Sequence, residues 1–226
     1  MDFFLIAILF CVLLATGLVF LDRRNLIVLS VLLSGNLVLW YLAIGRGMDF
    51  IYEENSWMEN IQAGVLLVSC VVFVFAGFAL REKHRVLALF LAVLCFIFSF
   101  REVDVDELGV STWLIFLLAE EGRAIFFVVA LVFLVLMLKD LKYYLGNRRL
   151  YLRSSFGIHI VQAAILLVVL SRAFEKDLFG FRHHVFYEEL SELLAYCLLF
   201  ATSLDLVKVL SGIGLKVGRQ GEVTDS

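Results

Sequence analysis

Proline is absent from this chain of 226 residues, and charged residues make up only 18% of it. Without proline, any kink in a helix has to come from glycine or from polar side chains. The low charge content excludes an ordinary soluble domain, because hydrophobic residues reach 62% against roughly 45–50% in soluble proteins. A strongly basic balance is also missing, since 22 acidic residues face 19 basic ones, so we expect no nucleic acid partner. The composition predicts an all-α integral membrane protein in contact with the lipid bilayer.

Seven apolar stretches approach the roughly 20 residues that a helix needs to cross a bilayer core about 30 Å thick. They lie at 3–21, 26–44, 61–80, 86–105, 118–138, 154–170 and 187–207. We therefore predict a seven-transmembrane helix bundle, with a single domain over 1–210 and a flexible cytoplasmic tail over 211–226.

The distribution of lysine and arginine predicts the orientation of the bundle. Sorted by connection, 13 of the 19 cations fall on the side that carries the C-terminus. Because cytoplasmic loops are enriched in Lys and Arg, we expect the N-terminus outside and the C-terminus in the cytoplasm, in the cell (inner) membrane. The acidic residues have the opposite distribution, with 16 of 22 on the outer side. Acidic residues contribute little to orientation, so their accumulation needs another explanation.

A pair of adjacent glutamates opens three of the predicted spans, at 53–54, 120–121 and 188–189. The span before each pair ends in an arginine, which is Arg46, Arg101 or Arg172. The chain therefore reads as one lead helix followed by three helical hairpins. Arginine at a helix C-terminus and glutamate at an N-terminus also complement the helix dipoles. The pattern thus has an architectural interpretation beside a functional one.

The length of two spans favours the functional interpretation. Residues 86–100 and 124–138 are free of charge, and about 15 residues at 1.5 Å each cover only roughly 22 Å. Extending both helices brings charges into the outer leaflet, where ionisable residues normally face the bundle interior or a wet cavity. We expect an acidic, His-containing pocket there that binds a cation or cationic group. Its predicted lining is Glu53, Glu54, Asn55, Glu59, Arg101, Glu102, Asp104, Asp106, Glu120, Glu121, Arg123, Arg172 and Glu189.

A metal site is predicted at the start of the last span. On a helix, His184, Glu188 and Glu192 share one face at spacings of four residues. Imidazole and carboxylate groups suit Zn²⁺ or Mn²⁺, whereas oxygen ligands alone suit Ca²⁺. No established metal-binding motif accompanies these residues, so the identity of the metal stays open.

The segment YEENSWMEN and the seven spans resemble the alkaline ceramidase type of membrane hydrolase. The resemblance implies a calcium ion held in part by Glu53, Glu54 and Asn55, and a metal-dependent lipid hydrolase activity. In this chain the three residues precede the third span instead of the first, and His183 and His184 are adjacent. The family's zinc pair, two histidines separated by three residues, is therefore absent.

A third interpretation is a non-enzymatic subunit or assembly factor of a membrane complex, whose acidic outer surface contacts a membrane or periplasmic protein. The apolar segment 110–119 is too short to span a bilayer and is expected at the membrane surface or over the pocket. The sequence does not decide between these interpretations or whether the protein is an enzyme.

Overall fold

The computed structural model describes residues 23–52, 57–80, 82–103, 111, 113, 115–116, 120–178 and 180–224. Within these ranges all regular structure is helical. The helices are α2 (Arg23–Trp40), the π-helix η1 (Tyr41–Gly45), the 3-10 turn η2 (Asp49–Ile51), α3 (Trp57–Ala79), α4 (Glu82–Ser99), α6 (Glu120–Lys139), α7 (Leu141–Gly146), α8 (Arg148–Leu152), α9 (Ser155–Ile165), the π-helix η4 (Leu166–Ser171), α10 (Arg172–Glu175) and α11 (His184–Thr224).

Five helical segments in this part of the chain are long and apolar enough to cross a membrane. They are Asn25–Gly45, Trp57–Ala79, Gly122–Lys139, Ser155–Glu175 and His184–Lys208. They coincide with the second, third, fifth, sixth and seventh predicted spans. The fourth prediction corresponds to the shorter apolar helix His84–Ser99, and the first lies outside the described residues. The chain is thus a helical protein whose long apolar helices suit a membrane. The total of seven spans stays a prediction.

Helix α11 forms the centre of the bundle. It packs against α3, α9 and η4, and also contacts α2 and α10. Its side chains include the fully buried Tyr196, Leu198 and Leu206. Helix α6 is the least buried of the five candidate spans, because only 11% of its span is buried within the protein. The remaining surface of α6 is apolar, as expected for a helix that faces lipid.

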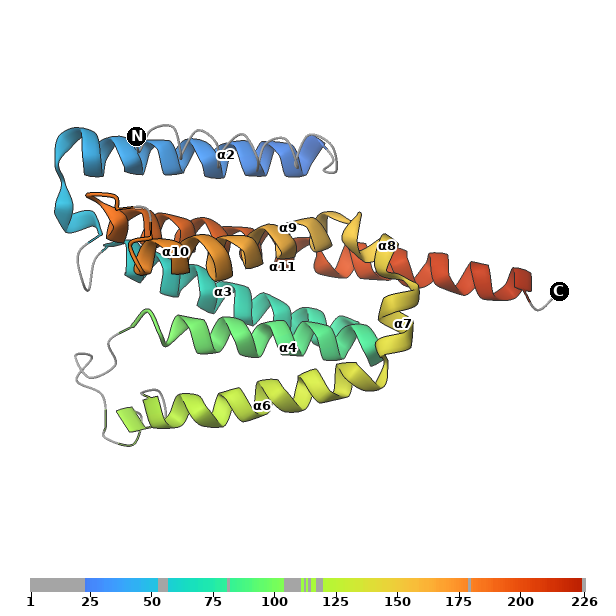
Figure 1. The fold of residues 1–226 in the computed structure, drawn as a ribbon. Coiled ribbons are helices and arrows are strands. Elements are labelled where there is room, and N and C mark those ends of the chain that lie inside the picture. The colour runs from blue at the N-terminus through green and yellow to red at the C-terminus, as the bar shows by residue number, and fades with distance from the viewer. Residues whose placement is uncertain are drawn as a thin grey trace.

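Successive long helices run in alternating directions, so the connections gather at two ends (Figure 1). One end carries η1, Arg101 and the connection from α10 to α11, and we call it the acidic end. The other carries the turn from α3 to α4 together with α7 and α8, and we call it the basic end. The sorting of cations and acids between the two sides, and the side of the membrane that each end faces, stay predictions.

Helices α3 and α4 pack closely because small residues face each other. A Cβ atom added at Gly77 would lie 3.0 Å from Leu89 Cδ2 and 3.8 Å from Ala88 Cβ. Ala88 and Ala92 are themselves buried. Small residues at such a contact let two helices approach, which is the usual means of helix association in membranes.

The structure differs from the sequence prediction at the end of the fourth span and adds detail about α2 and α11. The fourth helix ends at Ser99 instead of continuing to 105, and a hydrogen-bonded turn follows in which the amides of Arg101 and Glu102 donate to the carbonyl of Phe98. Helix α2 packs against α11, a contact that the hairpin pattern did not specify. Helix α11 continues through Thr224, and the flexibility expected for residues 211–226 stays a prediction.

Candidate functional site

A network of charged and polar groups lies at the acidic end, where α4 ends against α11. Arg101 is its centre: Nη2 lies 2.8 Å from Glu102 Oε1 and also forms an ion pair with Glu192 Oε2. The Tyr196 hydroxyl accepts a hydrogen bond from Arg101 Nη2 at 3.1 Å and donates to Glu102 Oε1 at 2.9 Å. The side chains of Glu102 and Glu192 are only 6% and 5% exposed, whereas that of Arg101 is 39% exposed. Two buried carboxylates therefore share the guanidinium of Arg101, which is partly exposed at the protein surface.

A π-helical turn supplies the next member of the network. Ser171 is the last residue of η4, and its hydroxyl donates to Glu192 Oε1 at 2.6 Å. Ser171 is itself buried. A π-turn inserts an extra residue into a helix and is frequent at functional sites. In this chain, which has no proline, η4 changes the helical register just before the hydroxyl that contacts Glu192.

Helix α3 enters the site through Gln62, which is fully buried. Its amide nitrogen donates to the carbonyl oxygen of Glu189 at 3.0 Å and to Glu189 Oε2 at 2.9 Å. The amide oxygen, Gln62 Oε1, has no hydrogen-bond partner among the described atoms. Ser99 fixes the end of α4 onto the same helix, because its hydroxyl donates to the carbonyl of Ala63 at 3.2 Å. Gln62 Oε1 is therefore a buried acceptor without a described donor, and it lies next to the carboxylate of Glu189.

Burial sets the proton affinity at the end of α4. It raises the pKa of Glu102 above its usual value of 4.5, while the Arg101 charge opposes this shift. Burial lowers the pKa of Arg101, but Tyr196, Glu102 and Glu192 raise it by more, so the net shift is upward. Arg101 thus keeps its positive charge, and Glu102 holds its proton more tightly than an exposed glutamate does.

Further acids surround this network. Glu188 lies within electrostatic range of Glu192, Arg101 and Arg172. Glu189 lies within range of Glu192 and also of Glu102 and Glu59. Acids from α3, from the end of α4 and from α11 therefore meet in one region of the molecule. The predicted residues that the structure brings together are Glu59, Arg101, Glu102, Arg172, Glu188, Glu189 and Glu192.

Some predicted residues have local partners. Arg172 Nη1 pairs with Glu175 Oε2 at 2.6 Å, and both side chains are well exposed. His183 Nδ1 lies 3.5 Å from the Tyr52 hydroxyl. His184 is half-buried, and its Nδ1 has no hydrogen-bond partner in the described part of the chain.

The predicted metal ligands His184, Glu188 and Glu192 all belong to α11. No group of three His, Cys, Asp or Glu side chains within the described ranges is close enough to hold a metal ion. Metal binding therefore stays a prediction.

Except for Arg123, the remaining predicted residues lie outside what the structure describes, or only their backbone is described. Glu53, Glu54, Asn55, Asp104 and Asp106 are in the first group, and Glu120 and Glu121 are in the second. The residues that carry the resemblance to alkaline ceramidases are thus untested. Arg123 is half-buried in the first turn of α6.

Two members of the network were not among the predicted site residues: Ser171 and Tyr196. Tyr196 follows Glu192 by four residues, a spacing that places both on one helix face. The same spacing rule applied beyond Glu192 would have found Tyr196. Ser171 gave no such signal, because its position depends on the π-turn.

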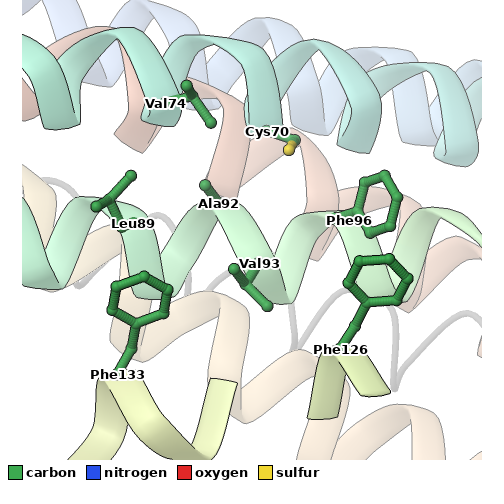
Figure 2. Close-up of a pocket in the computed structure, with 8 residues that line it drawn as sticks. All are labelled: Cys70, Val74, Leu89, Ala92, Val93, Phe96, Phe126 and Phe133. Carbon is green, nitrogen blue, oxygen red and sulfur yellow. The ribbon is translucent and has the colours of Figure 1, made fainter. Parts of the chain in front are cut away.

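Among the described residues, cavities lie at two places between the membrane-spanning helices. One, of about 250 Å³, lies between α3, α4 and α6 (Figure 2). It is lined by Cys70, Val74, Leu89, Ala92, Val93, Phe96, Phe126 and Phe133. The second, of about 310 Å³, lies between α2 and α11 and includes Asn25 and Asp205 among its lining residues. The first offers only apolar contacts, so it suits a lipid chain and not a polar ligand.

No protein-family model, curated protein or solved structure matches this chain. The function is therefore argued from the geometry of the site.

Proposed function

We propose that this membrane protein binds a cation or a cationic group in the cluster of acids at the acidic end of the bundle. The observation that carries the proposal is the buried amide oxygen of Gln62. It is an acceptor without a described donor, and the nitrogen of the same amide is fixed on Glu189. A buried acceptor without a donor costs about 1–3 kcal/mol. An ammonium group or a metal ion bound there would remove that cost.

The balance of charge supports the same conclusion. Arg101 is shared by Glu102 and Glu192, while Glu188 and Glu189 lie in the same electrostatic region. The acids of this region therefore outnumber its two arginines, Arg101 and Arg172, the second of which pairs with Glu175 and also lies within range of Glu188. Ionisable groups inside a membrane are costly and normally neutralise one another. A bound cation would supply the missing positive charge.

Between the two classes of cation, the described geometry favours an organic ammonium group. Such a group needs only a few oxygen acceptors in hydrogen-bond range, and Gln62 Oε1 with Glu189 provides them. A divalent metal needs at least three or four ligands. For a metal, His184, Glu188 and Glu192 stay the predicted ligands.

Isothermal titration calorimetry on the full chain in detergent tests the proposal with four probes: ethanolamine hydrochloride, CaCl₂, MnCl₂ and ZnCl₂. We expect saturable binding of at least one probe by the unmodified protein. Glu189→Gln and Gln62→Met should weaken that binding at least about 10-fold, because each removes a contact to a charged ligand worth about 1.5–3 kcal/mol. Gln62→Lys places an ammonium group beside Glu189 and should abolish binding while the protein stays folded.

Glu175→Gln is the matched control, because Glu175 lies at the same end of the bundle but pairs with Arg172 in an exposed position. It should bind the probe as the unmodified protein does. Absence of saturable binding for all four probes, or equal affinity in the control and in Glu189→Gln, would overturn the proposal. Circular dichroism at 222 nm confirms that each variant remains helical.

A further inference from the structure

A short segment crosses the basic end of the bundle, far from the acids. It consists of α7 and α8 and connects the end of α6 to the start of α9 at a steep angle to the long helices (Figure 1). We call residues 139–153 the basic strap. Because the long helices cross the bilayer, a segment that runs across their ends lies near the level of the lipid headgroups.

Aromatic contacts hold the basic strap against α4. The hydroxyl of Tyr143 lies 3.4 Å from His84 Nε2, and that of Tyr151 lies 3.2 Å from His84 Nδ1. The ring of Tyr144 packs against those of Tyr143 and Tyr151, with centroids 5.6 and 5.8 Å apart. Burial, with help from Asp140 and Tyr143, raises the pKa of Tyr144 to about 12. The hydroxyl of Tyr144 is thus neutral at physiological pH and adds no negative charge.

The outward surface of the basic strap combines two kinds of side chain. Three leucines are exposed: Leu141 at 44%, Leu145 at 53% and Leu152 at 55%. All five cations of the strap are exposed as well, namely Lys139, Lys142, Arg148, Arg149 and Arg153. Its one acid is Asp140. Exposed leucines beside exposed cations are typical of helices that lie in the membrane interface.

We infer that the basic strap binds the phosphate headgroups of anionic phospholipids in the leaflet at the basic end, while its exposed leucines contact the acyl chains. Each lysine or arginine near an anionic bilayer surface contributes about 1 kcal/mol of attraction. The adjacent Arg148 and Arg149 add paired hydrogen bonds, since a guanidinium can donate two bonds to one phosphate. A free phosphate ion would engage the cations but leave the leucines without a partner, so the combination favours a lipid.

The test compares lipid binding by the full chain in detergent, with retained lipids counted by native mass spectrometry. The probes are phosphatidylglycerol and phosphatidylcholine with identical dioleoyl chains. We expect the unmodified protein to retain phosphatidylglycerol at least about 10-fold more tightly. Arg148→Gln with Arg149→Gln should lower that affinity about 30-fold, which corresponds to two cations at about 1 kcal/mol each. Leu145→Gln should weaken the binding of both lipids.

Arg23→Gln with Lys208→Gln is the matched control, because it removes two exposed cations from the same end of the bundle but outside the strap. It should leave the preference for phosphatidylglycerol within about 3-fold of the unmodified value, because neither residue belongs to the strap that makes the proposed headgroup contacts. Equal retention of the two lipids by the unmodified protein would overturn the inference. The same holds if the control variant loses as much affinity as the strap variant, or if inorganic phosphate at equal concentration displaces phosphatidylglycerol completely.

Discussion

Replacing Glu192 with alanine tests whether the polar network stabilises the bundle. The change removes an ion pair with Arg101 and the acceptor of the Ser171 hydroxyl. A hydrogen bond to a charged group contributes about 1.5–3 kcal/mol. Arg101 still pairs with Glu102 and is 39% exposed, so losing its ion pair with Glu192 should cost an amount at the low end of this range. The hydroxyl of the buried Ser171 loses its acceptor, which adds a comparable cost. We expect a destabilisation of about 3 kcal/mol, or about 6–12 °C in melting temperature for a chain of this length.

The assay is thermal unfolding in detergent, followed by circular dichroism. Glu175→Ala is the matched control, because it removes an ion pair between exposed side chains. Exposed pairs contribute about 0–1 kcal/mol, so the control should melt within about 4 °C of the unmodified protein. If Glu175→Ala lowers the melting temperature as much as Glu192→Ala does, the network is not a stabilising feature and our reading of its burial is wrong.

Three further predictions concern other parts of the molecule. Gly157→Ala should prevent the correct start of α9, because a Cβ atom there would lie 2.1 Å from the Tyr151 carbonyl oxygen. Gly64→Ala is the control, because a Cβ atom at Gly64 meets open space and this variant should fold normally. Size-exclusion profiles and melting curves of the two variants check this. His84→Ala should speed amide hydrogen exchange in α7 and α8 while exchange in α3 stays unchanged, because the His84 ring contacts both Tyr143 and Tyr151. Equal protection of α7 and α8 in the variant and the unmodified protein would show that these contacts do not hold the two helices in place. Burial raises the pKa of Glu102 above 4.5, so the folded state holds this proton more tightly than the unfolded chain, and stability contributed at this residue falls as the pH rises above 4.5. The melting temperature of Glu102→Gln should therefore fall less between pH 4.5 and neutral pH than that of the unmodified protein, and parallel curves would contradict the assignment.

The sequence predicted the long helices well, because apolar length is a direct consequence of bilayer thickness. Five of the predicted spans have counterparts among the candidate membrane helices. The partner of each helix was less predictable. Helix α2 packs on α11, and no charged residue after Arg24 marks a face of this helix toward α11 rather than toward α3. The sequence also contained no signal for η4, since a π-turn needs no particular residue.

The candidate site was predictable where charge and helical spacing coincide. Glu188 and Glu192 share a face of α11, and the end of α4 brings Arg101 and Glu102 to the same level, as the short span suggested. An additional signal lay in the repeat itself: Tyr-Glu-Glu-X-Ser occurs both at 52–56 and at 187–191. Neither pattern identifies Gln62 as the residue that touches Glu189, because that contact joins positions 127 residues apart.

The uninterrupted helicity of α11 has a mechanical consequence. Its 41 residues, at about 1.5 Å each, form a rod of roughly 60 Å, about twice the thickness of the hydrocarbon layer. The rod begins beside the acids and extends past the basic strap at its other end (Figure 1). A tilt of α11 imposed near Glu192 would therefore displace its protruding end, by a distance that grows with the length of the rod.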